Sequence, residues 1–150
     1  MTLISTDELD NNLSGNIKII DATWHFSSKR NGFKEYQKQH IKNAIFFDLE
    51  KHSNQQKNLP HNHFLPKKSD WEKRLSEMGI SNDYKVVIYD NSDLITSCRC
   101  WFQFLYFGHR PDLIFILDGG LKNGNWKIEK LLIKKQKLNH QNTLLKKILI

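Results

Sequence analysis

The sequence predicts an α/β domain in which a parallel β-sheet is covered by helices on both faces. Short apolar runs alternate along the chain with segments of helical periodicity, an order typical of parallel strands joined by helical crossovers. The runs are apolar except for Lys18, which indicates strands buried on both faces. The expected strands lie at residues 17–20, 44–47, 86–89 and 113–117, and the expected helices at 5–13, 33–40, 69–78 and 98–107.

Local signals mark where the helices begin and end. Ser5-Thr-Asp-Glu8 and Ser69-Asp-Trp-Glu72 have the spacing of capping boxes, in which each side chain bonds to the other residue's backbone N–H group. Glycines follow the helices expected at 5–13, 69–78 and 98–107, where a left-handed residue can end a helix. Residues 52–66 are polar, contain two prolines and are predicted to form an irregular loop.

Length and charge indicate one folded domain, which we place at residues 3–129, followed by a basic tail at 130–150. A chain of 150 residues with 39% hydrophobic residues suits a single globular domain. The net charge of +7 arises at the end of the chain, because residues 122–150 hold eight lysines and one acid, Glu129. We interpret the tail as a solvated remnant of an interdomain linker. Binding of nucleic acid is disfavoured because no stacking aromatic residue follows Trp126.

The sequence gives no sign of a membrane or secreted protein. No apolar run approaches the ~20 residues that cross a bilayer. The first ten residues are acidic and mixed, without the basic start and apolar core of a secretory signal. Cys98 and Cys100, the only cysteines, cannot form a disulfide framework. We therefore expect a cytoplasmic protein.

Five motifs in register resemble the amino-terminal, rhodanese-like domain of thiosulfate and 3-mercaptopyruvate sulfurtransferases. They are Ile19-Ile-Asp-Ala-Thr-Trp24; His40-Ile-Lys-Asn-Ala44 with Phe46-Phe-Asp48; Leu59-Pro-His61 with Leu65-Pro66; Val86-Val-Ile-Tyr-Asp90 with Arg99, Trp101 and Phe107-Gly-His109; and Leu117-Asp-Gly-Gly-Leu121 with Trp126. Each motif alone is weak evidence, but their common order over about residues 3–129 makes the resemblance specific.

The resemblance implies a rhodanese fold with about five parallel strands, in tandem with a second domain that performs the chemistry. The whole enzyme would move a sulfane sulfur from thiosulfate or 3-mercaptopyruvate to a thiophilic acceptor through a cysteine persulfide, without a cofactor. We expect this chain to be truncated before the catalytic half and inactive alone. Its expected partner is that second domain or another copy of the chain, and neither a membrane nor nucleic acid. The alternative is a non-catalytic, regulatory module that binds a protein partner through the old domain interface.

Asp90 stands where the resemblance places the persulfide cysteine, directly after the strand expected at 86–89. Sulfur transfer needs a cysteine of low pKa in a loop whose backbone N–H groups stabilise the thiolate. The loop from Asp90 to Ser97 contains no glycine and no cation, and Asp90 and Asp93 would repel anionic sulfur donors. We therefore name no catalytic residue with confidence.

Cys98 and Cys100 are weak candidates for a nucleophile. They flank Arg99 on a predicted helix, so they lie on different sides of it and a bridge between them is not expected. Arg99 could lower the pKa of a neighbouring thiol, but a buried, structural cysteine is the favoured interpretation. A metal site is not expected, because the Cys-x-Cys pair lacks two further ligands.

His61 and Glu50 are candidates for an interdomain proton relay. The resemblance places His61 where the first domain lends a histidine to the second domain's site, and Glu50 where an acid orients it. Because two extra residues separate Leu59 from Pro66, His63 competes with His61 for that position. A metal bound by His61 and His63 is disfavoured in comparison with exposed loop histidines, since no matching acid or thiol ligand is nearby.

Arg99 has two interpretations. The favoured one is a structural ion pair with a carboxylate such as Asp21 or Asp90, because a buried arginine must be paired. The alternative is recognition of an anion at the domain interface.

Overall fold

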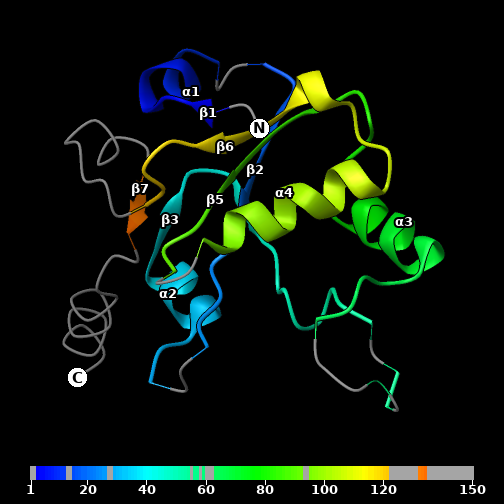
Figure 1. Ribbon diagram of the computed structural model, residues 1–150. Coiled ribbons are helices and arrows are strands. Elements are labelled where there is room, and N and C mark those ends of the chain that lie inside the picture. The colour runs from blue at the N-terminus through cyan, green and yellow to red at the C-terminus, as the bar shows by residue number, and fades with distance from the viewer. Residues whose placement is uncertain are drawn as a thin grey trace, which may run out of the picture.

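A five-stranded parallel sheet forms the centre of the computed structural model, which describes residues 3–12, 15–26, 29–54, 56–57, 59, 63–92, 95–121 and 132–134. Its strands are β1 (Leu3–Ile4), β2 (Ile17–Asp21), β4 (Ala44–Phe46), β5 (Lys85–Tyr89) and β6 (Ile114–Leu117). They lie in the order β1-β6-β5-β2-β4, and every pair is parallel. The carboxyl ends of all five strands therefore meet at one edge of the sheet (Figure 1).

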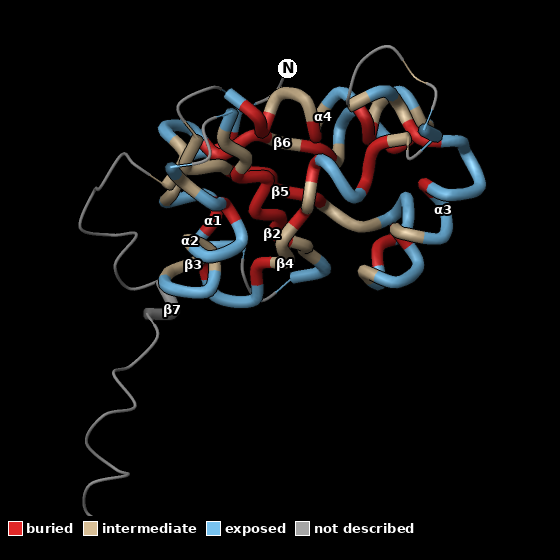
Figure 2. The backbone as a smooth tube through the Cα atoms, turned by 90° about the horizontal axis from the view of Figure 1, so that it is seen from below, coloured by how far each residue is buried: buried red, intermediate tan, exposed pale blue. Residues whose placement is uncertain are grey.

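Four helices cover this sheet, and they lie on both of its faces. They are α1 (Thr6–Asn12), α2 (Gly32–Lys38), α3 (Lys68–Glu77) and α4 (Thr96–Tyr106). Figure 2 shows α1 and α2 on one side of the buried strands and α3 on the other. A 3₁₀ turn at Pro111–Leu113 leads into β6. The predicted α/β architecture with about five strands is confirmed.

Successive residues of the strands supply two separate cores, which explains why the strand sequences are mostly apolar. On one face, Ile20 and Ile88 pack in a cluster with Trp71 of α3 and Phe104 of α4. On the other face, Ile19 and its neighbours pack in a second cluster with Leu9 of α1. Side chains of a strand alternate between faces, so a sheet covered by helices on both sides favours apolar residues at successive positions.

The first predicted capping box is confirmed and the second is wrong. The backbone N–H of Ser5 donates to Glu8 Oε2 (2.8 Å), and the Glu8 N–H donates to Ser5 Oγ (3.2 Å). Helix α3 instead begins at Lys68, one residue before Ser69. Lys67 has an extended backbone and its carbonyl already accepts from the Trp71 N–H (3.0 Å), so Ser69 lies within the first turn.

Two short strands were not predicted and form a separate antiparallel pair. Strand β3 (Gln39–Ile41) follows α2 directly and pairs with β7 (Leu132–Lys134). Strand β7 belongs to the segment expected as a basic tail, so part of that segment pairs with the domain (Figure 1). The remainder of 130–150 lies outside the described residues. Among the described residues, no helix is long and apolar enough to cross a membrane.

Candidate functional site

The loop after β5 occupies the position where catalysis is expected in this architecture. Ligand sites of parallel α/β sheets lie beyond the carboxyl ends of the strands, and β5 lies in the middle of the sheet, between β6 and β2. We call residues 90–95, which connect β5 to α4, the cradle loop. The structure describes Asp90, Asn91, Ser92 and Ile95 of it, while Asp93 lies outside the described residues.

The Asp90 side chain fills the space in which amide groups would hold an anion. Its Oδ1 accepts from the Ser92 backbone N–H (3.0 Å), and its Oδ2 accepts from the Ser97 N–H (2.6 Å) in the first turn of α4. Backbone N–H groups at a helix start stabilise negative charge. The loop therefore has anion-holding amides, and its own carboxylate already uses two of them.

The next residues fix the cradle loop to β2 through a chain of hydroxyl groups. Thr96 Oγ1 donates to the Ala22 carbonyl (2.7 Å). A hydroxyl has one proton, so the Ser92 hydroxyl, 2.6 Å from Thr96 Oγ1, is the donor between them. Ser92 Oγ also accepts from the Trp24 backbone N–H (3.0 Å). The Trp24 N–H, the Ser92 and Thr96 hydroxyls and the Ala22 carbonyl thus form one continuous hydrogen-bonded chain.

Glu35 of α2 holds the loop at Asn91. Its carboxylate accepts from Arg30 Nε and Nη2 (both 2.8 Å) and from Asn91 Nδ2 (3.0 Å), and His25 Nε2 lies 3.2 Å away. Burial raises the pKa of Glu35, but the hydrogen bonds and charges of Arg30 and His25 leave it below its usual value. Arg30 also donates to the Asn91 carbonyl (3.0 Å), so the fold brings to this loop a cation that its own sequence lacks.

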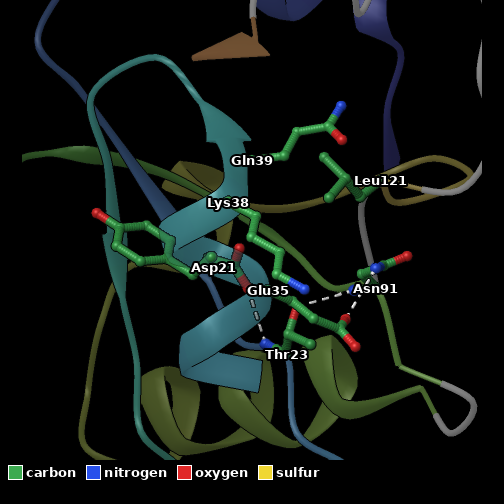
Figure 3. A pocket seen from close by; sticks show the side chains of 8 residues that line it. Asp21, Thr23, Glu35, Lys38, Gln39, Asn91 and Leu121 are labelled. Carbon is green, nitrogen blue, oxygen red and sulfur yellow. Dashed lines mark hydrogen bonds between the residues drawn. The ribbon is translucent and has the colours of Figure 1, made fainter. Parts of the chain in front are cut away.

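Two hollows flank the cradle loop. The larger, of about 300 Å³, lies beside β1 and β6 and is lined by apolar side chains together with Asp90, Asp118 and Cys98. The smaller, of about 140 Å³, is lined by polar groups that include Asp21, Glu35 and Asn91. Lys38 extends toward the middle of this smaller hollow (Figure 3).

Asp21, at the end of β2, is the most buried carboxyl group of the smaller hollow. It is 1% exposed, and its Oδ1 accepts from the Thr23 N–H (2.9 Å). Burial raises the pKa of Asp21, against the lowering effect of hydrogen bonds from Thr23 and Tyr89. The pKa of the Tyr89 hydroxyl is raised by burial and by the charge of Asp21. Asp21 thus lines the smaller hollow, and Tyr89 is hydrogen-bonded to it.

The two cysteines have different surroundings, and neither lies within the cradle loop. Cys100 is fully buried in the core beneath α4, and burial raises its pKa well above the ordinary value. Cys98 lines the larger hollow beside Asp90. Its pKa is raised by burial and then by the charge of Asp90, so the neighbouring Arg99 does not activate it. Neither thiol has the low pKa that sulfur chemistry needs.

A second group of residues, which we call the histidine cluster, consists of Trp24, Glu50, His63 and Arg99. Glu50 Oε1 accepts from the Trp24 indole N–H (3.1 Å) and lies 3.8 Å from His63 Nε2. The Trp24 and His63 rings meet edge to face at 4.8 Å. His61, the predicted partner of Glu50, lies outside the described residues. The structure brings the competing His63 to Glu50.

The predicted ion pair of Arg99 with Asp21 or Asp90 is wrong. Arg99 Nη2 instead donates to the His63 carbonyl oxygen (2.6 Å), and the guanidinium lies over the Phe102 ring, 5.9 Å from its centroid. No carboxylate among the described residues lies within 4.0 Å of it. Arg99 lies in the first turn of α4 and contacts the loop at His63, which the sequence spacing alone did not show.

Sequence reasoning missed three contributors to this edge of the sheet: the Arg30–Glu35 pair, the Ser92–Thr96 hydroxyl chain and Trp24. Their contacts span between 4 and 68 residues of sequence. Trp24 carried a signal, because it ends the Asp-Ala-Thr-Trp motif. In the described part of the chain, no group of three or more acidic, histidine or cysteine side chains could hold a metal ion.

Comparison with known proteins agrees with this geometry. The model of the rhodanese-like domain family matches residues 5–127. Thiosulfate/3-mercaptopyruvate sulfurtransferases 2 and 1 of Arabidopsis thaliana, the latter mitochondrial, are 40% and 39% identical over 121 residues, 79% of this chain. The crystal structure of SseA from Escherichia coli, a 3-mercaptopyruvate sulfotransferase, has a TM-score of 0.76 at 29% identity and covers 90% of this chain.

The match is to part of each of these proteins. The chain spans about a third of the length of the plant relatives, 34% and 31%, and 51% of the SseA chain. The matched part is the amino-terminal one. The chain belongs to the rhodanese-like domain family and is homologous to the amino-terminal part of tandem-domain thiosulfate/3-mercaptopyruvate sulfurtransferases.

Proposed function

We propose that this chain is the non-catalytic first domain of a sulfurtransferase, which acts together with a cysteine-bearing second rhodanese domain. The observation that carries the proposal is the Asp90 carboxylate, which occupies two backbone N–H groups of the cradle loop. The whole enzyme would transfer a sulfane sulfur from thiosulfate or 3-mercaptopyruvate to a thiophilic acceptor. This chain alone is then inactive.

The chemistry of sulfur transfer explains why a cradle loop with Asp90 in place of a cysteine would be inactive. With thiosulfate, a cysteine thiolate attacks the sulfane sulfur, a new S–S bond forms, and the old one breaks to release sulfite with the electron pair. The persulfide then gives its outer sulfur to an acceptor such as cyanide, which becomes thiocyanate as the thiolate returns. A carboxylate cannot carry sulfur in this way. Its fixed charge would also repel the anionic donor from the same amides.

His63 is the proposed contribution of this chain to the partner's active site. We assign the predicted relay to His63 because Glu50 Oε1 lies 3.8 Å from His63 Nε2, while the other candidate, His61, lies outside the described residues. A carboxylate beside an imidazole orients it and stabilises its protonated form. Proton transfer by such a histidine typically contributes ~10²–10⁴-fold to a rate. The cluster would assist a leaving group or an acceptor held by the second domain.

Sulfurtransferase assays test the proposal directly. The chain is assayed with thiosulfate plus cyanide and with 3-mercaptopyruvate plus a thiol, first alone and then with a separately produced, cysteine-bearing second rhodanese domain. We expect turnover only in the mixture, and a loss of about 10²-fold when the chain carries His63→Ala. Turnover by the chain alone that disappears with Cys98→Ser or Cys100→Ser would overturn the proposal.

Exposed aromatic side chains favour the alternative of a partner-binding or regulatory module. Phe26, Tyr106 and Phe102 are 87%, 61% and 44% exposed. Phe102 and Tyr106 are neighbours on α4, with ring centroids 6.0 Å apart. Such side chains are enriched at protein interfaces. Sedimentation that shows a stable dimer, which Phe102→Ser and Tyr106→Ser together dissociate, would favour this alternative with a second copy as the partner.

The predicted cytoplasmic location stays a prediction.

A further inference from the structure

His63 has a backbone conformation that an ordinary residue adopts only when its surroundings hold it there. Its φ is +67°, and Asn43 is the only other described residue besides glycine with a positive φ. For a residue with a Cβ atom this left-handed region costs roughly 1–2 kcal/mol. Something must therefore hold His63, which lies outside the helices and strands and precedes Phe64, whose carbonyl accepts from the Asn54 backbone N–H (2.9 Å).

Arg99 supplies the hydrogen bond that holds this backbone. Its Nη2 donates to the His63 carbonyl oxygen at 2.6 Å, across 36 residues of sequence. The guanidinium lies over the Phe102 ring. Because no described carboxylate pairs with Arg99, this carbonyl is its one hydrogen-bond acceptor in the described part of the chain. Burial without a counter-ion also lowers the pKa of Arg99.

The imidazole of His63 is oriented by Trp24. The indole edge meets the imidazole at 4.8 Å, while its N–H holds the Glu50 carboxylate that faces His63 Nε2. Trp24 is itself fixed, because its backbone N–H donates to Ser92 Oγ in the cradle loop. Trp24 therefore sets the direction of the His63 ring, and Arg99 holds the His63 backbone.

The first turn of α4 connects both arrangements. Thr96 and Ser97 bind the cradle loop, and Arg99, two residues later, binds His63. An α-helix is rigid over one turn, so these contacts keep a constant spacing. The position of the histidine is thereby set by the same helix that holds the silenced loop.

We propose that Arg99 is a positioning residue, which holds His63 in its left-handed conformation so that the imidazole is presented beside Glu50 and Trp24. The proposal rests on the function proposed above only where it says what the oriented imidazole is for. The contact between Arg99 and His63 and its effect on the ring are properties of the chain by itself. They can be measured without any sulfur chemistry.

Nuclear magnetic resonance on the isotope-labelled 150-residue chain tests the proposal. The readouts are the nuclear Overhauser contact between the Trp24 and His63 rings and the scalar coupling that reports φ of His63. In the Arg99→Ala chain we expect the ring contact to disappear and the coupling to move to that of an extended residue. Arg99→Lys should retain both, because the carbonyl needs one donor and not the guanidinium fork.

Arg110→Ala is the matched control. Arg110 is exposed and its described partner is Asp112, at the opposite end of α4, so this change should leave both His63 readouts as they are. His63→Gly removes the cost of the positive φ. In that background, Arg99→Ala should lower the unfolding midpoint by less than it does with His63 present.

Two outcomes would overturn the positioning role. One is a ring contact that persists in Arg99→Ala. The other is a contact that is already absent from the unmodified chain. Failure of the proposed function gives a different pattern: the contact is lost in Arg99→Ala as expected, while His63→Ala leaves turnover of the two-domain mixture unchanged. The two failures are therefore distinguishable.

Discussion

The cradle loop and the histidine cluster lie at the same edge of the sheet and are both bound by the first turn of α4, but they differ in what they leave unpaired. In the cradle loop, the Asp90 carboxylate, the Asn91 amide and the Ser92 hydroxyl all have partners. In the histidine cluster, His63 Nε2 is buried without a hydrogen-bond partner among the described residues. The polar side chains of the cradle loop are thus satisfied within the chain, whereas His63 Nε2 has no hydrogen-bond partner in the described part of the chain.

This comparison separates two ways in which a family member can change. Under the proposed function, an acid in place of a nucleophile does not empty the site, because the Asp90 carboxylate accepts from two backbone N–H groups of the kind that stabilise a thiolate. The loop keeps its shape, so the surrounding contacts also remain. The cluster around His63 contains no cysteine, and its service to a partner domain is the proposal made above. The predictions below test how firmly the cradle loop is held and how acid affects the segment that leads to the histidine cluster.

The largest expected effect comes from the glycine that packs against the cradle loop. A Cβ atom at Gly120 would lie 2.6 Å from the Asp90 carbonyl oxygen, and φ there is +54°. We expect Gly120→Ala to lower the free energy of unfolding by about 3–4 kcal/mol, measured by urea denaturation, since backbone atoms on both sides must move.

Gly79→Ala is the control for that change. Gly79 has a similar φ of +64°, but its Cβ would meet only the Lys18 ammonium group at 3.5 Å. It should cost about 1 kcal/mol, the conformational term alone. Equal losses of unfolding free energy in Gly120→Ala and Gly79→Ala would mean that the cradle loop moves to accept the added methyl group. The cradle loop would then not be rigid.

Acid should loosen the segment that leads to the histidine cluster. Burial and the charge of Arg74 lower the pKa of His52 to about 4. The unfolded state, with a histidine pKa of about 6.5, binds the proton first, so stability is present above pH 6.5 and is lost as the pH falls toward 4. The loss should reach up to about 3 kcal/mol over that interval.

Denaturation midpoints at several pH values, with His52→Gln as the comparison, measure this dependence. The substitution should remove most of the acid slope. Part will remain, because burial also lowers the pKa of His109. A slope identical in the two proteins would show that His52 is not the titrating group.

Removal of the carboxylate should open the cradle loop at a smaller cost. Asp90→Ala leaves the Ser92 and Ser97 N–H groups without their acceptor, which should lower the free energy of unfolding by about 2 kcal/mol. Asp90→Asn retains one acceptor oxygen, so its free energy of unfolding should lie between those of Asp90→Ala and the unmodified chain. Asp118→Ala, in the same hollow, is the control and should change stability little. Full stability of Asp90→Ala would mean that water replaces the carboxylate.

The smallest expected effect is on the reactivity of Cys98. Burial and the Asp90 charge raise its pKa, so its alkylation rate should still be increasing at pH 9. In a Cys100→Ser background, Asp90→Asn should accelerate alkylation at pH 8 by about 3-fold through loss of one negative charge. Asp118→Asn should not. An unchanged rate in Asp90→Asn would leave burial as the sole cause.

Much of the fold could be predicted because its signals are local. Strand β5 contains the uninterrupted apolar run Val86–Tyr89, and the reciprocal bonds of Ser5 and Glu8 depend on three residues of spacing. Strands β1 and β3 are two and three residues long, too short for periodicity to be seen. Their existence depends on pairing with distant strands. The same limit applies to β7.

The sequence by itself determined the family, the parallel sheet and the acid after β5, because these depend on order and spacing along the chain. Only the tertiary structure decided that Arg30 reaches the cradle loop, that Arg99 holds His63 and no carboxylate, and that Cys98 faces Asp90. These contacts join segments up to 61 residues apart, and their direction depends on how helices rotate over the sheet. Side-chain orientation across packed layers is a property of that packing, and linear spacing does not encode it.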